Sequence, residues 1–298
     1  MKTAVIGLSN GKWFAHRLAA HLGKKTSPFS FRKFPDGELY IKFDSSLRGK
    51  KVILVQSLCC AKNSSPNDAI LELVFAARTA KKLGAKKVVA VVPYLAYMRQ
   101  DKAFNFGESF SAKEMAWLLS QCIDALFSFD PHLHRISSLS KIFSVPAKKL
   151  SADKKIAEFV AQRFSKENTV VVGPDFESSQ WAKKIADSIG FWSSILQKRR
   201  FGDRKVEVKV VKELEWENKN IVIIDDIIST GNTIVQAILE LKKRKPRAVY
   251  CICVHPILAE GALSKILKAG AKEVISCNSI ESKTNRIDLS GEVAKFLM

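Results

Sequence analysis

Short runs of β-branched and apolar residues alternate with longer amphipathic segments along the whole sequence. The runs are typical of buried strands, and four of them are TAVIGL (3–8), KVILVQS (51–57), TVVVGPD (169–175) and NIVIIDD (220–226). The intervening segments repeat apolar residues at helical spacing, as in DAILELVFAARTAKKLG (68–84) and TIVQAILELKKRK (233–245). Strands that alternate with helices in this way form βαβ units with parallel sheets. The pattern therefore predicts an α/β fold.

The second half of the chain is similar to the first half when the sequence is shifted by about 167 residues. TAVIGLSNGKWFAHRLAAHLG (3–23) then aligns with TVVVGPDFESSQWAKKIADSIG (169–190), and AILEL occurs verbatim at 69–73 and 237–241. One match can be coincidence, but a collinear series indicates an internal duplication. Because 298 residues also exceed the usual size of one core, we predict two copies of one domain, residues 1–148 and 149–298.

The two predicted copies differ where a strand leads into a helix. The second copy has Asp225-Asp226 followed by STGNT, whereas the first has Gln56-Ser57 followed by CCAKNSSPND. Burying two neighbouring carboxylates is costly. Since the first copy forms the same unit without them, stability of the fold does not explain the acids. The difference indicates a functional site in the second copy.

Residues 229–233 can supply the remainder of such a site. In an open parallel sheet, ligands bind at the carboxyl ends of the strands. Backbone amides and hydroxyls at a helix N-terminus favour a phosphate group, and Asp225 and Asp226 can accept hydrogen bonds from sugar hydroxyls or bind a hydrated cation. Simple helix capping is the alternative for the Ser, Thr and Asn side chains, although it does not explain the acid pair.

The composition predicts an anionic partner, because 49 Lys and Arg residues oppose 29 acids and give a net charge of +20. The lysines are scattered in pairs that are typical of a solvated surface, and we find no nucleic-acid-binding signature, so we predict no nucleic-acid partner. No apolar run is long enough to span a membrane. The six cysteines form no CxxC pair, which favours reduced thiols and a cytoplasmic protein.

GLSNGKW (7–13) resembles a Walker A loop but differs from it in two ways. Three residues separate its glycines, and Trp13 follows Lys12 where Ser or Thr is required. We therefore interpret this segment as a strand-to-helix turn.

Five segments together resemble one known family. VIIDDIISTGNTI (222–234) is similar to the phosphoribosyl-pyrophosphate-binding motif of the type I phosphoribosyltransferase fold. Four more resemble ribose-phosphate pyrophosphokinases in particular, namely FPDGELY (34–40), PYLAYMRQDK (93–102), DPHLHRI (130–136) and LQKRRF (196–201). The resemblance is collinear over nearly the whole chain. It implies two tandem, internally duplicated type I phosphoribosyltransferase-like domains, each with a mainly parallel sheet flanked by helices.

The resemblance also implies a reaction, a cofactor and a set of site residues. The pyrophosphoryl group of ATP would be transferred to the 1-hydroxyl of ribose 5-phosphate, with Mg²⁺ as cofactor, in a homo-oligomer whose neighbouring subunits share the ATP site. The implied ATP-binding residues are Phe34, Asp36, Glu38, Arg99, Gln100 and Asp101. The implied ribose-5-phosphate-binding residues are Asp225, Asp226, Ser229, Thr230, Gly231, Asn232 and Thr233. His132 and Asp175 would bind the metal, and Lys198 and Arg200 would be catalytic.

The sequence departs from the family pattern at three places. Ser229 stands where many members have Asp, Asn232 stands where a small residue is common, and DFESSQ (175–180) replaces a glycine-containing segment. Two alternatives therefore stay open. One is a non-catalytic regulatory homologue of the synthetase, and the other is a phosphoribosyltransferase that uses phosphoribosyl pyrophosphate as donor.

Overall fold

The computed structural model describes residues 1–60, 64–103, 105–133, 135–201, 205–210 and 215–298, which divide into two compact units. The first unit comprises Met1–Ser151, Ser279–Glu281 and Leu289–Met298, and the second comprises Ala152–Asn278 and Ser282–Asp288. Within these described ranges, no helix is long and apolar enough to cross a membrane. The domain boundary that we predicted between residues 148 and 149 was drawn from the duplication of the sequence, and it stays a prediction.

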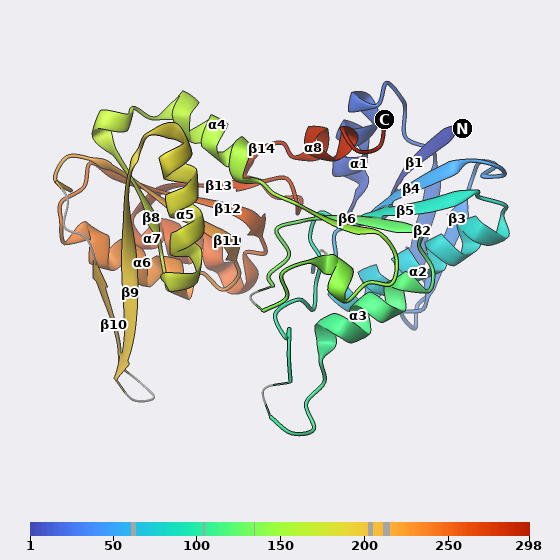
Figure 1. Ribbon diagram of the computed structural model, residues 1–298, viewed down its shortest axis with the longest axis horizontal. Helices are drawn as coiled ribbons and strands as arrows, with labels where there is room; N and C mark the ends of the chain where they lie inside the picture. Colours follow the sequence, from blue (N-terminus) through green and yellow to red (C-terminus); the bar gives the residue numbers. More distant parts are fainter. Residues whose placement is uncertain (61–63, 104, 134, 202–204, 211–214) are drawn as a thin grey trace. The chain divides into compact units, whose positions relative to one another are not determined.

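The first unit contains a five-stranded parallel sheet with the strand order β1-β4-β5-β6-β7 (Figure 1). The strands are β1 (Thr3–Gly7), β4 (Lys51–Val55), β5 (Lys87–Val91), β6 (Ala125–Phe129) and β7 (Ala147–Leu150). The helices are α1 (Lys12–His21), α2 (Pro66–Lys82), α3 (Ser111–Ser120) and α8 (Ser290–Ala294), with a short 3₁₀ turn η1 (Leu139–Lys141). β2 (Phe29–Lys33) and β3 (Leu39–Phe43) form a separate antiparallel hairpin.

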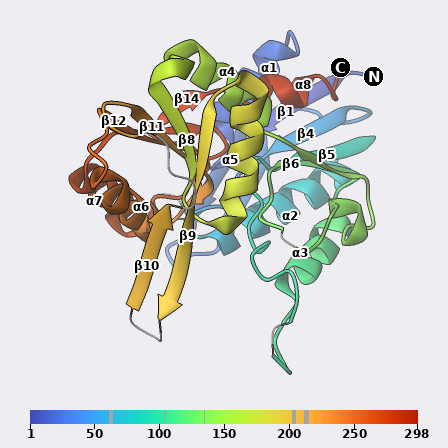
Figure 2. The same ribbon diagram turned by 60° about the vertical axis from the view of Figure 1, so that its left-hand side comes forward.

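The second unit contains a seven-stranded sheet with the order β10-β9-β8-β11-β12-β13-β14. Its strands are β8 (Thr169–Gly173), β9 (Trp192–Phe201), β10 (Lys205–Val210), β11 (Asn220–Ile228), β12 (Ala248–Pro256), β13 (Ala271–Cys277) and β14 (Asn285–Ile287). The helices are α4 (Asp153–Arg163), α5 (Phe176–Ile189), α6 (Asn232–Lys242) and α7 (Ala262–Ala269), with 3₁₀ turns η2 (Lys166–Asn168) and η3 (Ala259–Gly261). β10 runs antiparallel to β9, whereas the other paired strands of this sheet are parallel, and Figure 2 shows the long β9–β10 pair beside α5.

The predicted fold class is confirmed, and the two units repeat one order of elements. In the first unit β1 and α1 are followed by the hairpin β2–β3 and then by β4, and in the second unit β8 and α5 are followed by β9–β10 and then by β11. GLSNGKW forms the turn between β1 and α1, as predicted.

Burial follows the sequence pattern that predicted each element. Parallel strands are covered on both faces and therefore read as continuous apolar runs, and Val170, Val171 and Val172 of β8 are all buried. Helix α2 buries Ala69, Leu73, Ala76 and Ala80, which lie at helical spacing on one face. All six cysteines are free thiols, and only Cys60 is exposed.

Candidate functional site

The sequence pattern placed Asp225 and Asp226 at the end of a strand. In the structure they lie inside strand β11, which continues to Ile228. The pairing of β11 with β8 stops at Ile223, which is opposite Val172, whereas its pairing with β12 continues to Ile228, opposite Pro256. The two acids therefore follow the point where β8 ends, while β12 still supports their backbone. This arrangement holds the acids rigidly at the carboxyl edge of the sheet.

At this edge, the negative charges of Asp226 and Asp175 act on the carboxyl group of Asp225. Burial raises the pKa of the Asp225 carboxyl well above its ordinary value, and the charges of Asp226 and Asp175 raise it further. Asp225 is 8% exposed and accepts a hydrogen bond from the Asp226 N–H at 3.0 Å. Such a concentration of negative charge favours a bound cation or hydroxyl donors, because either offsets the repulsion.

Asp175 follows β8 and caps the N-terminus of α5. Its Oδ1 accepts a hydrogen bond from the Ser178 N–H at 2.9 Å, and the Asp175 N–H donates to the Ser178 hydroxyl at 3.2 Å, which together form a capping box. The cap fixes the orientation of the carboxylate next to Asp225. Asp175 therefore has a structural role as well as a place among the three acids.

Helix α6 begins directly after β11 without a side-chain cap. Gly231 is the N-cap residue, with a left-handed φ of 79°, and among the described residues no side-chain cap hydrogen bond is formed there. A Cβ atom at Gly231 would lie 3.2 Å from side-chain atoms of Ala262 and Ile266 of α7. Ser229, Thr230 and Thr233 are half-buried and Asn232 is exposed. The capping alternative is therefore wrong for α6, and its N-terminal amides are suited to an anion.

The corresponding position of the first unit contains a buried polar network. Gln56 is buried after β4, donates to Glu72 Oε2 at 2.7 Å and accepts from the Asn10 N–H at 2.9 Å. Burial raises the pKa of Glu72, although hydrogen bonds from Ser9 and Gln56 oppose this effect. The next helix, α2, is capped by the Ser65 side chain. This strand-to-helix junction thus satisfies its own polar groups.

The FPDGELY segment forms the turn of the β2–β3 hairpin. Phe34 N–H donates to Glu38 O at 2.8 Å, and Gly37 adopts a φ of 97° in the tight turn. Asp36 and Glu38 are exposed. The Arg32 guanidinium lies 4.4 Å from the ring centroids of both Phe34 and Tyr40. The hairpin therefore presents aromatic rings, a cation and two carboxylates at and beside its turn.

The loops after β5 and β6 are joined by an ion pair in which the Asp101 carboxylate is buried and the Arg135 side chain is exposed. Asp101 is 2% exposed, and its carboxylate accepts from the Arg135 backbone N–H at 2.7 Å and from Arg135 Nη1 at 2.9 Å. Gln100 Oε1 accepts from the Ser111 hydroxyl at the start of α3, at 2.9 Å. Arg99 is exposed. Sequence reasoning missed Arg135, because pairing across the two loops leaves no local signal.

His132 is half-buried and follows β6 in the first unit, whereas Asp175 belongs to the second unit. Among the residues that the structure describes, no group of three His, Cys, Asp or Glu side chains forms a preassembled metal site. Lys198 and Arg200 lie in β9, opposite Val208 and Val206 of β10, but their side chains fall outside the described part. The predicted roles of all site residues stay predictions.

Two family models match consecutive parts of the chain. The N-terminal domain of ribose phosphate pyrophosphokinase matches residues 3–122, and a phosphoribosyl transferase domain matches residues 138–290. The hairpin and the Asp101 loop lie in the first match, and Asp175, β11 and the start of α6 lie in the second.

Full-length relatives give the same result. The chain is 32% identical over 292 residues to a ribose-phosphate pyrophosphokinase of Methanopyrus kandleri, covering 98% of this chain and 97% of the relative. It is 36% identical over 295 residues to that of Methanothermobacter thermautotrophicus, covering 98% and 99%. The crystal structure of phosphoribosylpyrophosphate synthetase from Mycobacterium smegmatis superimposes with a TM-score of 0.87 at 25% identity, covering 100% of this chain and 98% of that one.

Proposed function

The chain belongs to the ribose-phosphate pyrophosphokinase family, and on that premise we propose that it transfers the pyrophosphoryl group of ATP to the 1-hydroxyl of ribose 5-phosphate. The products are 5-phosphoribosyl 1-pyrophosphate and AMP. The observation that carries the proposal is the acid pair of β11 followed at once by the uncapped start of α6.

In this proposal the second unit binds ribose 5-phosphate. The 5-phosphate would accept hydrogen bonds from the amides and hydroxyls of residues 229–233, where the helix dipole also favours negative charge. Asp225 and Asp226 would accept hydrogen bonds from the ribose hydroxyls. Since β12 pairs with β11 beyond both acids, the sugar would meet a preorganised edge.

Mg²⁺ fits the donor groups of this edge, because carboxylate oxygens are hard ligands, and burial together with the charges of Asp226 and Asp175 raises the pKa of Asp225. Mg²⁺ usually binds through one or two carboxylates together with substrate phosphates and water, so a site of three preassembled protein ligands is not required. Asp175 is the proposed ligand at this edge, and Asp225 and Asp226 would bind the ion directly or through water. His132 of the first unit stays a predicted ligand. The bound ion would neutralise charge on the transferring phosphates.

ATP would bind through residues of the first unit. Phe34 supplies a ring for base stacking, Asp36 and Glu38 supply acceptors, and Arg99 and Gln100 supply polar contacts. We assign Asp101 a positioning role, because its carboxylate is already bound by Arg135. The hairpin would serve the ATP site of a neighbouring copy, which makes a homo-oligomer part of the proposal.

Lys198 and Arg200 would act on the transferring group. Pyrophosphoryl transfer depends mainly on positioning and on stabilising the charge of the transition state. Two cations on the β9–β10 pair are suited to that task. We therefore expect their replacement to lower turnover more than ribose 5-phosphate affinity.

The test is formation of AMP from ATP and Mg²⁺, measured with and without ribose 5-phosphate. Sugar-dependent AMP together with 5-phosphoribosyl 1-pyrophosphate supports the proposal. A folded protein that binds both substrates but forms no AMP would be a regulatory homologue. Consumption of 5-phosphoribosyl 1-pyrophosphate only when a nucleobase is present would identify a phosphoribosyltransferase instead.

A further inference from the structure

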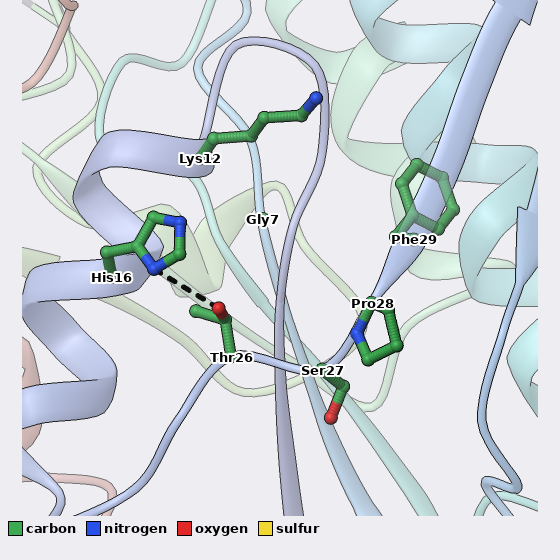
Figure 3. Close-up of a pocket in the computed structure, with 7 residues that line it drawn as sticks. All are labelled: Gly7, Lys12, His16, Thr26, Ser27, Pro28 and Phe29. Atoms are coloured by element: carbon green, nitrogen blue, oxygen red, sulfur yellow. Dashed lines mark hydrogen bonds between the residues drawn. The ribbon is translucent and has the colours of Figure 1, made fainter.

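A cavity of about 220 Å³ opens in the first unit beside the end of β1 (Figure 3). Lys12 and His16 of α1 stand on one side of it, and residues 26–29 form the other side. This segment follows the free edge of β1, where the Ser27 N–H donates to Val5 O at 2.7 Å. The cavity is therefore framed by a helix and by an anchored strand-like segment, and it contains none of the residues expected to bind ATP or ribose 5-phosphate.

The polar groups of the cavity are cationic or neutral. Lys12 carries a positive charge, Thr26 and Ser27 carry hydroxyls, and no acidic side chain belongs to the lining of the cavity. His16 Nδ1 and Thr26 Oγ1 are hydrogen-bonded at 3.1 Å, which fixes the imidazole ring. Figure 3 shows the other ring nitrogen directed away from Thr26, on the side of Lys12.

The internal duplication provides a comparison within the chain. A second cavity, beside α5 and β9, is lined by Lys183, Asp187 and Ser193 among others, and there Lys183 forms an ion pair with Asp187. Aligning HRLAAHLG (16–23) with KKIADSIG (183–190) places His16 on Lys183 and Ala20 on Asp187. The cavity of the second unit thus contains its own counter-ion, whereas the cavity of the first unit lacks the corresponding acid.

The charge of Lys12 acts on the Glu72 carboxyl, which is already engaged in hydrogen bonds. Its carboxylate accepts hydrogen bonds from the Ser9 N–H, the Ser9 hydroxyl and Gln56 Nε2. Lys12 is exposed, so its ammonium group can contact a ligand at the mouth of the cavity.

We propose that this cavity binds the phosphate group of a small molecule. Lys12 would supply the charge and Ser27 a hydroxyl donor, and His16 would donate its Nε2–H while Nδ1 accepts from the Thr26 hydroxyl. Its volume is roughly fifteen times the minimum that one water requires, so it has room for more than a phosphate group. Pro28 and Phe29 would then contact the apolar part of a phosphomonoester, while inorganic phosphate would use the polar side alone.

The test follows the His16 imidazole by NMR in the full-length protein, with its resonances assigned by comparison with His16→Gln. Inorganic phosphate and phenyl phosphate are titrated separately at constant ionic strength. We expect a saturable shift of the His16 resonances. Lys12→Gln should weaken the binding measured at His16 by about tenfold or more, because a charge-assisted contact is lost. Lys183→Gln, in the cavity with its own counter-ion, is the matched control and should leave the dissociation constant unchanged.

Each outcome decides the proposal. Saturation by both probes identifies the phosphate group as the ligand, and saturation by phenyl phosphate alone identifies a monoester with an apolar body. A His16 shift no larger than that caused by chloride at equal ionic strength overturns the proposal. Equal weakening of phosphate binding by Lys12→Gln and Lys183→Gln would also overturn the proposal, because it would indicate general charge screening. Because the readout is a single side chain, phosphate bound at the substrate site does not contribute to the measured shift.

Discussion

At the edge of the second sheet, Asp225 is a residue that the proposed function requires and that also lowers the stability of the fold. Asp225 is buried beside Asp226 and within the electrostatic reach of Asp175, and its pKa is raised in the folded protein. A group with a raised folded-state pKa contributes stability below its ordinary pKa, and this contribution is lost as the pH rises through the folded-state pKa. At neutral pH, above the ordinary pKa of aspartate, the buried Asp225 carboxyl therefore destabilises the protein in the absence of ligands.

Asp225→Asn should separate stability from activity. It preserves the acceptor for the Asp226 N–H and removes the charge, so the melting temperature at about pH 7 should rise by about 2–4 °C, and the gain should disappear near the ordinary pKa of aspartate. The value of kcat/KM for ribose 5-phosphate should fall about 10- to 100-fold. Thermal unfolding across pH and the AMP assay measure the two effects.

The exposed Asp187 supplies the control, since Asp187→Asn removes an equal charge from the same unit without relieving burial. A melting temperature of Asp225→Asn below that of the wild type at neutral pH would contradict the account of the buried charge.

Gly231 provides a second test at this scale. Gly231→Ala should cost about 1–2 kcal/mol for a left-handed residue with a Cβ and about 1–3 kcal/mol more for crowding against Ala262 and Ile266. Gly190, at the end of α5, has a φ of 71°, and a Cβ added there would have no atom within 4 Å, so Gly190→Ala isolates the conformational cost. Urea unfolding measures both variants, and equal losses would show that contact with α7 is unimportant.

At the scale of elements, the β2–β3 hairpin gathers chemistry that no single residue supplies. Arg32 lies over the rings of both Phe34 and Tyr40, which meet edge to face at a centroid distance of 6.2 Å. Phe34 is 38% exposed, so its ring is partly available to a base. The antiparallel ladder fixes the register from Lys33–Leu39 to Phe29–Phe43 and holds this arrangement at the turn.

Phe34→Ala should impair ATP use selectively. Loss of a stacking partner is expected to raise the KM for ATP about 5- to 100-fold while the KM for ribose 5-phosphate stays unchanged. Lys42→Ala is the control, because Lys42 lies on the same hairpin and pairs with the neighbouring Asp44. Steady-state kinetics with each substrate varied in turn measures both KM values. A rise in the KM for ribose 5-phosphate equal to that for ATP would count against the assignment of Phe34 to the ATP site.

The sequence predicted the elements well and their tertiary connections poorly. Continuous apolar runs and helical periodicity identified β8, β11, α2 and α6 because these signals are local. The extension of β11 to Ile228 depends on pairing with β12, and the engagement of Asp101 depends on Arg135 in another loop. Neither partner is specified by neighbouring residues. The acid pair and the glycine at the start of α6 were found because their chemistry is concentrated in one short stretch.

At the scale of the whole molecule, the chain does not divide into two units at a single point. Residues 279–281 and 289–298 belong to the first unit. The Lys51 ammonium donates to Leu297 O at 2.9 Å, Lys148 Nζ lies 3.6 Å from the Phe296 ring centroid, and Leu289 and Val293 are fully buried. Periodicity marks residues 290–294 as a short helix at most, and it gives no indication of the unit against which they pack.

Leu289→Ala should therefore destabilise the first unit. Truncating a fully buried Leu costs about 2–5 kcal/mol, and hydrogen exchange should show reduced protection of β1, β4 and α1. Met298→Ala, at a side chain that is 85% exposed, is the matched control. Reduced protection confined to β8, β11 and β12 would refute the assignment of this segment to the first unit.

The return of residues 289–298 also sets an order for assembly on the ribosome. Residues 1–151 are synthesised long before residues 289–298, so the first unit can bury Leu289 and Val293 only after this later segment has been made. The second unit, apart from its short edge strand β14, is complete in sequence by Asn278. Although domains usually mature from the N-terminus onward during synthesis, we expect the N-terminal unit of this chain to be completed after the second unit.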